Sequence, residues 1–425
     1  MIEKLHPKFS PIEILTAKKC GVNRITEFAT LEKFQIQLLK QQLNYAKSHS
    51  PFFAEHLKQV DIKYINCYQD LKQIPLMSAE QIYQNGTAMA CLPLNLIPRF
   101  TTIRSSGTQG PVKQLYFTDN DIKKTAEFFT YGVQSMTHNV KKAVICLPGP
   151  AIGSIAQVLS RGLNVLGIQT YTFGAIKNYE AAAAVCLDFQ ADCVIGLPSQ
   201  ILQLAKTYPE LKPQSVFLTA DYIPDSLVKS IEEIWQCEVL SHYGLSECGL
   251  GGGVECPAHN GYHMRHHDLL YEIINPDTGE ILPYGEFGEV VFSTLNREAM
   301  PLFRYRTGDI ACLNADKCQC GAILPRLSKI KGRLKNFIVL ENEKLNIQQL
   351  DEIILALPKV LDYQPKIENN TLKLYIKAYP QDMPGIEKKI KDILPNLKIE
   401  VYQGDGFYTR GTIKRNIEII LPENN

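Results

Sequence analysis

The sequence predicts an α/β protein, and three observations support this fold class. Short apolar runs alternate with helical stretches between about residues 140 and 244. Continuous apolar strands of this kind are typical of parallel sheets that helices cover on both faces. After His263 the pattern changes to β-hairpins, and beyond residue 336 it becomes a small α+β unit. We therefore expect a large N-terminal domain with parallel-rich sheets flanked by helices and a β-rich subdomain, followed by a small C-terminal domain.

The N-terminal elements follow from hydrophobic periodicity. Residues 26–60 carry apolar side chains near a 3.6-residue period, which predicts helix. Apolar runs predict strands at residues 141–149, 164–173, 191–198, 215–221 and 237–244. The stretches between these runs predict helices at residues 152–163, 178–189, 198–208 and 224–235.

The C-terminal part begins with residues 269–295, which predict β-hairpins with turns at 277–279 and 284–285. The small α+β unit follows, with elements expected at residues 336–346, 348–357, 371–378, 385–394 and 398–403. A basic segment from Arg326 to Asn336 contains Gly332 and is expected to be a linker or hinge. We place the large domain at residues 1–331, with its β-rich subdomain at about 264–331, and the small domain at residues 336–425.

Composition restricts the class of protein. The chain has 425 residues, of which 45% are hydrophobic and 21% charged, as in ordinary globular proteins. A net charge of +1 gives no indication of a nucleic-acid-binding surface. No run reaches the roughly 20 apolar residues that a membrane span needs, and the N-terminus lacks the apolar stretch of a signal peptide. We expect a cytoplasmic protein whose twelve cysteines are thiols or metal ligands rather than disulfides.

A small, hydroxyl-rich turn lies between two β-like runs in residues 101–118. Its glycines permit a close backbone approach, and its hydroxyl and backbone N–H groups can form an anion-binding nest. Lys113 adds a positive charge after the turn. The sequence differs from that of a P-loop nucleotidase, and a plain polar hairpin is the alternative. The residues expected to bind phosphate are Ser105, Ser106, Gly107, Thr108, Gln109 and Gly110.

Four further segments resemble one superfamily in their order and spacing. They are HYGLSECG at residues 242–249, YRTGD at 305–309, KGRLK at 331–335 and GTIKR at 411–415. With SSGTQG they resemble the adenylate-forming enzymes, and most closely the phenylacetate–coenzyme A ligase branch. The runs YAKSHSPFFAEHL at 45–57 and CQCGAILPR at 318–326 resemble the same branch. The resemblance covers essentially the whole chain.

The resemblance implies a reaction in two halves. A carboxylate attacks the α-phosphate of ATP to give an acyl-adenylate and pyrophosphate, and a thiol, usually that of coenzyme A, then displaces AMP. Glu247 matches the residue that helps to hold Mg²⁺, Tyr243 the aromatic residue beside adenine, and Asp309 the residue that binds the ribose hydroxyls. Further nucleotide-binding residues are implied at Ala220, Asp221, His242, Gly244, Ser246, Arg326 and Arg333.

The hinge of these enzymes corresponds to Lys335, about which their small domain rotates between the two half-reactions. Arg333 is also a candidate catalytic residue. The family expects a lysine where this chain has Thr412, and Gly411 and Arg415 match the positions around it. In an extended strand Lys414 would point to the same side as Thr412, roughly 6–7 Å further along. We treat Lys414 as the catalytic lysine. The alternative is slow adenylation, in a protein that processes or only binds an adenylate.

Cysteines and histidines form a second constellation. CPAHNGYH at residues 256–263 carries zinc-ligand spacing, and the CQCG run supplies two more thiolates. Zinc favours four nitrogen or sulfur ligands in a closed tetrahedral site, which is structural rather than catalytic. Unpaired thiols and surface histidines are the alternative. We expect His266 and His267 to be solvated. The predicted ligands are Cys256, His263, Cys318 and Cys320, with His259 as the substitute for His263.

The acyl pocket is expected to be apolar, since ligand pockets mostly are. An aryl or arylacetic acid fits the resemblance, and coenzyme A, a carrier-protein thiol or an amine remain open as acceptors. Relatives of this branch are often dimers, so a homodimer is a further expectation. No nucleic-acid or membrane partner is expected. The candidate pocket residues are Phe129, Tyr131, Ala151, Ile152, Gly153, Tyr243, Gly244 and Gly249.

Overall fold

The structure is a computed structural model that describes residues 10–104, 112–134, 140–149, 153–334, 337–340, 343–407 and 415–420. The chain divides into two compact units, each built from three segments. Unit 1 consists of Met1–Asn139, Pro150–Gly167 and His242–Ile330. Unit 2 consists of Val140–Gly149, Ile168–Ser241 and Lys331–Asn425. Within the described ranges, no helix is both long and apolar enough to cross a membrane.

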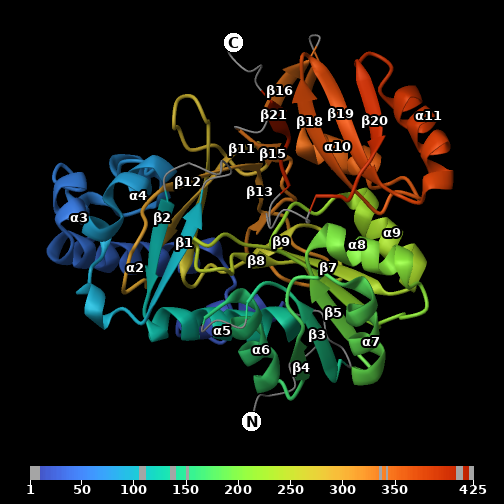
Figure 1. The fold of residues 1–425 in the computed structure, drawn as a ribbon. Coiled ribbons are helices and arrows are strands. Elements are labelled where there is room, and N and C mark those ends of the chain that lie inside the picture. Colours follow the sequence, from blue (N-terminus) through green and yellow to red (C-terminus); the bar gives the residue numbers. More distant parts are fainter. Residues whose placement is uncertain are drawn as a thin grey trace. The chain divides into compact units, whose positions relative to one another are not determined.

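The helices from the N-terminal part of the chain, α1 to α6, belong to unit 1 (Figure 1). Its α-helices are α1 (Pro11–Lys19), α2 (Phe28–His49), α3 (Pro51–His56), α4 (Ala79–Asn85), α5 (Asp119–Gln134) and α6 (Ile155–Val165). Its short 3-10 helices are η1 (Ile62–Tyr64), η2 (Tyr68–Gln73), η3 (Gly86–Met89) and η4 (Leu94–Leu96). The helical region predicted at residues 26–60 is confirmed, with a break before Pro51. There the Ser50 hydroxyl accepts a hydrogen bond from the Phe53 N–H at 3.3 Å and caps the new helix.

The strands of unit 1 form antiparallel arrangements, which confirms the predicted β-rich subdomain. Strand β1 (Arg99–Arg104) pairs with β2 (Val112–Phe117). Strands β10 (Leu269–Ile274), β11 (Gly288–Thr294) and β12 (Tyr305–Ala311) pair in that order. Strands β13 (Leu313–Asn314), β14 (Arg326–Leu327), β9 (Tyr262–Met264) and β8 (Gly253–Val254) form another ladder. The last two residues of β7 (Glu238–Tyr243) pair with β8.

The N-terminal part of unit 2 is the predicted parallel sheet, in the order β7-β6-β5-β3-β4. Its further strands are β3 (Lys142–Cys146), β4 (Gln169–Thr172), β5 (Cys193–Gly196) and β6 (Ser215–Leu218). Helices α7 (Tyr179–Phe189), α8 (Pro198–Thr207) and α9 (Asp225–Trp235) lie alongside these strands (Figure 1). Strands β5 and β6 are buried along their whole length, because helices cover the sheet, and this explains their continuous apolar sequence.

The C-terminal part of unit 2 is a mixed sheet in the order β20-β19-β18-β21 with helices packed on it. Two of its strands, β18 and β21, were not predicted from the sequence. One apolar core combines side chains of this part with those of the parallel sheet. The elements are β15 (Gly332–Arg333), β16 (Phe337–Leu340), β17 (Glu343–Asn346), α10 (Ile347–Ile354), β18 (Asp362–Glu368), β19 (Thr371–Lys377), η5 (Pro380–Asp382), α11 (Met383–Ile393), β20 (Ile399–Gln403) and β21 (Glu418–Ile420).

Two polar contacts join these parts of unit 2. The Lys206 ammonium donates to the carbonyl oxygens of Leu355, Leu357 and Val360 at 2.7–3.0 Å. Burial lowers the pKa of Lys206 to about 8. The Glu352 carboxylate accepts the backbone N–H groups that begin α9, at 2.8 and 3.0 Å. The first contact holds the chain that follows α10, and the second satisfies N–H groups at the start of α9.

Arg415 organises buried charge in unit 2. Its guanidinium donates to Asp351 Oδ1 at 2.8 Å, to Asp362 Oδ1 at 2.6 Å and to the Tyr363 carbonyl oxygen at 2.8 Å. All these side chains are buried. Burial raises the pKa of Asp351 to about 6, although the neighbouring Arg415 acts in the opposite direction. The guanidinium therefore compensates two carboxylates that would be costly to bury alone.

Replacing Arg415 by methionine should lower the free energy of unfolding by about 3–5 kcal/mol, because Asp351 and Asp362 would lose their buried cation. Urea denaturation of both proteins measures this difference. The control is Lys366→Met, whose partner Glu418 is 41% exposed at 3.0 Å. This control should cost less than about 1 kcal/mol. Equal effects of the two substitutions would show that Arg415 is not needed to compensate these carboxylates.

Candidate active site and metal-ligand cluster

The chain folds back on itself directly after β7, in residues 244–250. The Leu250 N–H donates to the Leu245 carbonyl oxygen at 2.9 Å, and the Gly249 N–H donates to the Ser246 carbonyl oxygen at 3.0 Å. Gly244 has no room for a side chain, because a Cβ there would collide with the backbone oxygen of Leu250. This tight fold brings Glu247 to the end of the strand as a fixed, buried carboxylate.

Glu247 has a positively charged partner in unit 1. The Lys113 ammonium lies 2.5 Å from Glu247 Oε1, and both side chains are at most 10% exposed. The Tyr305 hydroxyl lies 3.0 Å from each of these two groups. The pairing of Lys113 with Glu247 was not predicted. Tyr305 could have been found, because it begins the YRTGD run that also carries Asp309.

Tyr243 and Asp309 lie next to one another. The Tyr243 hydroxyl donates to Asp309 Oδ2 at 3.1 Å, and both residues are buried. Burial, with the nearby Asp309 carboxylate, raises the pKa of Tyr243 well above 10, so this hydroxyl remains a donor at neutral pH. The two residues that the sequence suggested for adenine and ribose therefore form one hydrogen-bonded pair.

Side chains from elsewhere in unit 1 hold the backbone of residues 244–250 in place. Arg297 donates to the Glu247 carbonyl oxygen at 3.3 Å. The Thr125 hydroxyl donates to the Gly249 carbonyl oxygen at 2.8 Å. Both contacts are made to backbone carbonyl oxygens of the segment. The Glu247 carboxylate itself contacts Lys113 and Tyr305.

The predicted pocket residues that the structure describes belong to unit 1. Phe129, on α5, is buried, and its ring centroid lies 5.3 Å from that of His242. Burial lowers the pKa of His242 to about 3, so its ring is neutral at physiological pH. Tyr131 is half-buried on the same helix, and Gly153 has a φ of +72° just before α6. Their contact with a substrate remains a prediction.

Other predicted nucleotide residues belong to unit 2. Ala220 has a φ of +72°, and Asp221 Oδ2 accepts the Arg415 N–H at 3.2 Å. Arg333 is half-buried in β15. Arg326, in unit 1, is fully buried and donates to the carbonyl oxygens of Asn260 and Asp316 at 2.9 and 2.6 Å. Those bonds hold neighbouring loops together, and a nucleotide contact of Arg326 remains a prediction.

Some predicted residues lie outside the part of the chain that the structure describes. They are the loop residues Ser105, Ser106, Gly107, Thr108, Gln109 and Gly110, the pocket residues Ala151 and Ile152, the hinge residue Lys335, and Gly411, Thr412 and Lys414.

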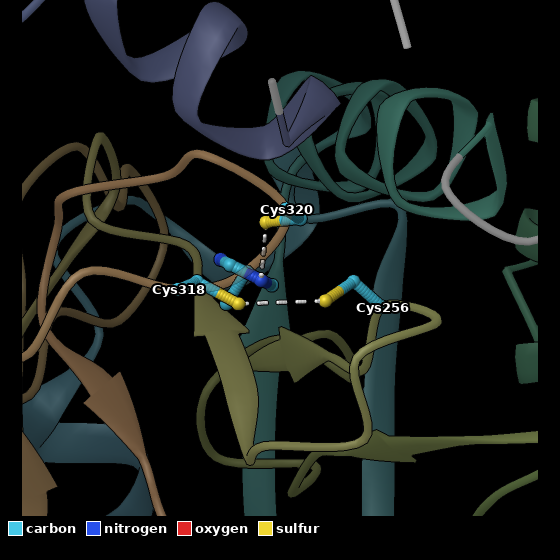
Figure 2. Close-up of side chains that lie close together, drawn as sticks. Cys256, Cys318 and Cys320 are labelled. Atoms are coloured by element: carbon cyan, nitrogen blue, oxygen red, sulfur yellow. Dashed lines mark hydrogen bonds between the residues drawn. The ribbon is translucent and has the colours of Figure 1, made fainter. Parts of the chain in front are cut away.

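Three thiols and one imidazole meet in unit 1. The ligand atoms of Cys256, His263, Cys318 and Cys320 all lie within 4.8 Å of one another. The sulfur atoms of Cys256 and Cys318 are 3.7 Å apart, and Cys320 Sγ lies 3.5 Å from His263 Nε2. Figure 2 shows the three cysteines pointing toward a common centre. Hydrogen bonding from Cys256 and His263 lowers the pKa of Cys320, which favours its thiolate.

Strand pairing explains how residues 62 positions apart meet. Val254 of β8 and Arg326 of β14 both pair with His263 of β9. This places the turn after β8 next to the loop before β14. Within that loop, the Gly321 N–H donates to the Cys318 carbonyl oxygen at 2.9 Å and forms a short knuckle. Glu13 Oε2 then accepts the N–H groups of the two residues after Ala322, at 2.7 and 2.9 Å.

The neighbouring histidines differ in their surroundings. His259 lies outside the cluster, and its Nδ1 is 3.7 Å from Glu255 Oε1, so His263 rather than its substitute belongs to the cluster. The prediction that His266 and His267 are solvated is wrong, because both are buried. His266 Nε2 lies 2.8 Å from the Pro325 carbonyl oxygen, and His267 Nδ1 lies 3.2 Å from the Thr16 hydroxyl. Burial lowers the pKa of each to about 4.

Comparison with known proteins gives consistent relatives. The chain is 29% identical to a phenylacetate-coenzyme A ligase of Thermus thermophilus over 78% of this chain and 77% of that protein. It is 27% identical to one of Pseudomonas putida over 91% of this chain and 92% of that protein. It is 26% identical to one of Escherichia coli over 76% of each. No family model matches the chain.

Solved structures share the fold. A 2-hydroxyisobutyryl-CoA ligase in the postadenylation state superposes with a TM-score of 0.77 at 15% identity, covering 93% of this chain and 89% of that one. An open conformation of that ligase gives a TM-score of 0.67 at 15% identity, over 92% of each chain. The sequence matches and the shared fold confirm the predicted resemblance to the adenylate-forming superfamily and to its phenylacetate–coenzyme A ligase branch.

Acidification should destabilise the protein through its buried histidines. A histidine whose pKa is lowered by folding contributes stability above its unfolded pKa of about 6.5, and this contribution is lost as pH falls. For His266, the loss between pH 7 and pH 5 is about 2 kcal/mol. Between pH 7 and pH 5, the free energy of unfolding of His266→Gln should therefore fall less than that of the wild-type protein, by this amount. Urea titrations at both pH values measure it, and an unchanged loss in the variant would contradict the assignment.

Proposed function

We propose that this chain, a homologue of the phenylacetate–coenzyme A ligases, uses ATP to join a carboxylic acid to coenzyme A. In the first half-reaction, a carboxylate oxygen attacks the α-phosphorus, the bond to the β-phosphate bridge breaks, and pyrophosphate leaves. In the second, a thiolate sulfur attacks the acyl carbon, the bond from that carbon to the phosphate oxygen breaks, and AMP leaves.

The observation that carries this proposal is the arrangement of Tyr243, Glu247 and Asp309. Tyr243 and Glu247 belong to one tightly folded segment, and Asp309 is hydrogen-bonded to Tyr243. A carboxylate that binds two ribose hydroxyls makes strong charge-assisted hydrogen bonds. With Tyr243 beside the base, Glu247 would lie four residues further along the same segment, on the side of the phosphates.

Glu247 fits a magnesium site in its chemistry, since a carboxylate oxygen is a ligand that this hard cation prefers. Bound Mg²⁺ would offset charge on the phosphate groups. The hydroxyl-rich residues 105–110 would hold the phosphates through hydroxyl and backbone N–H groups. Arg333 and Lys414 would add positive charge near the reacting phosphate, where negative charge develops.

We assign the acid to the aryl or arylacetic class, because the relatives act on phenylacetate. Phe129 and the small residues Gly244 and Gly249 would line its pocket, with the neutral His242 ring behind Phe129. A carrier-protein thiol or an amine is the alternative acceptor. A homodimer is the expected assembly, because relatives of this branch are often dimers.

The small domain, residues 336–425, would rotate about Lys335 between the half-reactions, as hinge closure generally completes a site. Such a rotation would have to exchange the contacts of Lys206 and Glu352 that join the two parts of unit 2. If Lys414 does not replace the lysine missing at Thr412, adenylation would be slow and the chain would mainly process or hold an adenylate.

The four-residue cluster fits zinc. Sulfur and nitrogen ligands at about 2.3 and 2.0 Å from a tetrahedral zinc lie roughly 3.5–3.8 Å apart. The distances of 3.7 Å between two sulfurs and 3.5 Å between sulfur and nitrogen agree with this geometry. With four protein ligands the ion would have no open position, so it would stabilise the fold and take no part in the chemistry.

Pyrophosphate release with ATP and a panel of aryl, arylacetic and fatty acids tests the activity. We expect release with at least one aryl acid. In Glu247→Gln the rate of release should fall about 100-fold, because the negative charge that develops in the transition state would be less well stabilised. Thr412→Lys should raise the rate if no other lysine serves, whereas Lys414→Ala should lower it if Lys414 does. No release with any acid would overturn the ligase proposal.

Zinc analysis of the purified protein tests the cluster. The wild-type chain should contain about one zinc per chain, and Cys318→Ser should lose most of it together with thermal stability, because a structural ion contributes folding energy. Cys67→Ser is the matched control, since this cysteine lies outside the cluster and its thiol contacts Asp70. Less than about half a zinc per wild-type chain would count against four-ligand binding.

A further inference from the structure

Lys113 lies in a compact site for an ammonium group. Its Nζ contacts Glu247 Oε1 at 2.5 Å and the Tyr305 hydroxyl at 3.0 Å, and that hydroxyl also lies 3.0 Å from Oε1. Nζ lies 5.4 Å from the ring centroid of Tyr83 and 5.6 Å from that of Tyr305. A carboxylate, a hydroxyl and two aromatic faces are the surroundings that stabilise a buried cation.

The backbone at Lys113 is held in place by strand pairing. Lys113 is the second residue of β2, and its Cα pairs with that of Ile103 in β1. In the sequence, Lys113 comes three residues after Gly110, the last residue of the run expected to bind phosphate. Its position therefore couples one end of that run to the acidic side chain of Glu247.

Glu247 Oε1 already accepts hydrogen bonds from the Lys113 ammonium and the Tyr305 hydroxyl. A magnesium ion on Glu247 Oε1 would lie about 2.0–2.1 Å from it, within the space next to the Lys113 ammonium. Two positive charges a few ångströms apart repel strongly when both are shielded from water. Metal binding at this oxygen is therefore favoured when the ammonium has moved away from it.

We propose that Lys113 is a positioning residue that holds Glu247 in the nucleotide-free protein and that magnesium–nucleotide must displace from Oε1. The inference rests on the proposed function only in assigning Glu247 to the metal. The flexible four-carbon stem of a lysine lets the ammonium move several ångströms while the β2 backbone stays in place. After displacement, the charge can pair with a phosphate oxygen, so metal binding and phosphate binding are coupled through one side chain.

Removing the ammonium has two consequences. Lys113→Met keeps the length and apolar stem of the side chain but removes the competitor, so the metal should bind Glu247 more tightly. In the metal-free variant, Glu247 keeps the Tyr305 hydroxyl at 3.0 Å but loses the ammonium beside it, which destabilises the fold because the carboxylate is buried. Added metal ions should restore much of that stability in the variant and add little to the wild-type protein.

Binding of Mn²⁺ in the absence of nucleotide, followed by electron paramagnetic resonance, tests the proposal. We expect the apparent Kd for Mn²⁺ to fall about tenfold in Lys113→Met and in Lys113→Gln. Lys113→Arg retains the charge and should not show this gain. Lys123→Met is the matched control, since this lysine is exposed on α5. Glu247→Gln should weaken Mn²⁺ binding with or without Lys113.

Thermal unfolding gives a second readout that does not require turnover. In the presence of a chelator, Lys113→Met should unfold at a lower temperature than the wild-type protein. Added Mn²⁺ should raise the unfolding midpoint of the variant more than that of the wild-type protein. A folded Lys113→Met that binds Mn²⁺ no more tightly than the wild-type protein would overturn the proposal. If pyrophosphate release failed with every acid, the ligase proposal would fall while a Mn²⁺ gain in Lys113→Met would still support competition at Glu247.

Discussion

A carboxylate removed from water needs a cation or hydrogen-bond donors beside it, and this constraint governs the site around Glu247. Its neighbours come from three separate parts of the chain: Lys113 from β2, Tyr305 from β12 and the backbone of its own folded segment. Glu247 therefore joins distant segments of unit 1. The same carboxylate that keeps these elements together without nucleotide is the one expected to receive the metal ion.

Buried charge has a similar role in unit 2. Arg415 joins Asp351 of α10 to Asp362 of β18, and its own backbone N–H contacts Asp221. In the sequence, the motif that contains Arg415 departs from the family at Thr412, where a lysine is expected. In the structure, Arg415 itself compensates two buried carboxylates. A motif residue can thus have a clear physical role in the fold, independent of the reaction that the motif suggests.

Much of the fold could be predicted because local patterns reflect burial. The apolar strands β5 and β6 are buried from end to end, and β10 pairs antiparallel with β11 across the predicted turns. Strand β18 was missed because Pro365 and several charged residues weaken its apolar pattern. The members of the cysteine–histidine cluster were predicted from spacing together with the resemblance, whereas their meeting depends on the pairing of β8, β9 and β14. Burial of His266 and the Lys113–Glu247 contact depend on distant packing, which no local pattern contains.

The central claim is that a carboxylate oxygen attacks the α-phosphorus of ATP at this site. It is tested most directly with an acid labelled with ¹⁸O in its carboxylate, ATP and the acyl acceptor, followed by mass spectrometry of the nucleotide product. Attack at the α-phosphorus predicts one ¹⁸O atom in AMP after the acyl group has been transferred. AMP without label, or ¹⁸O in inorganic phosphate, would contradict the account.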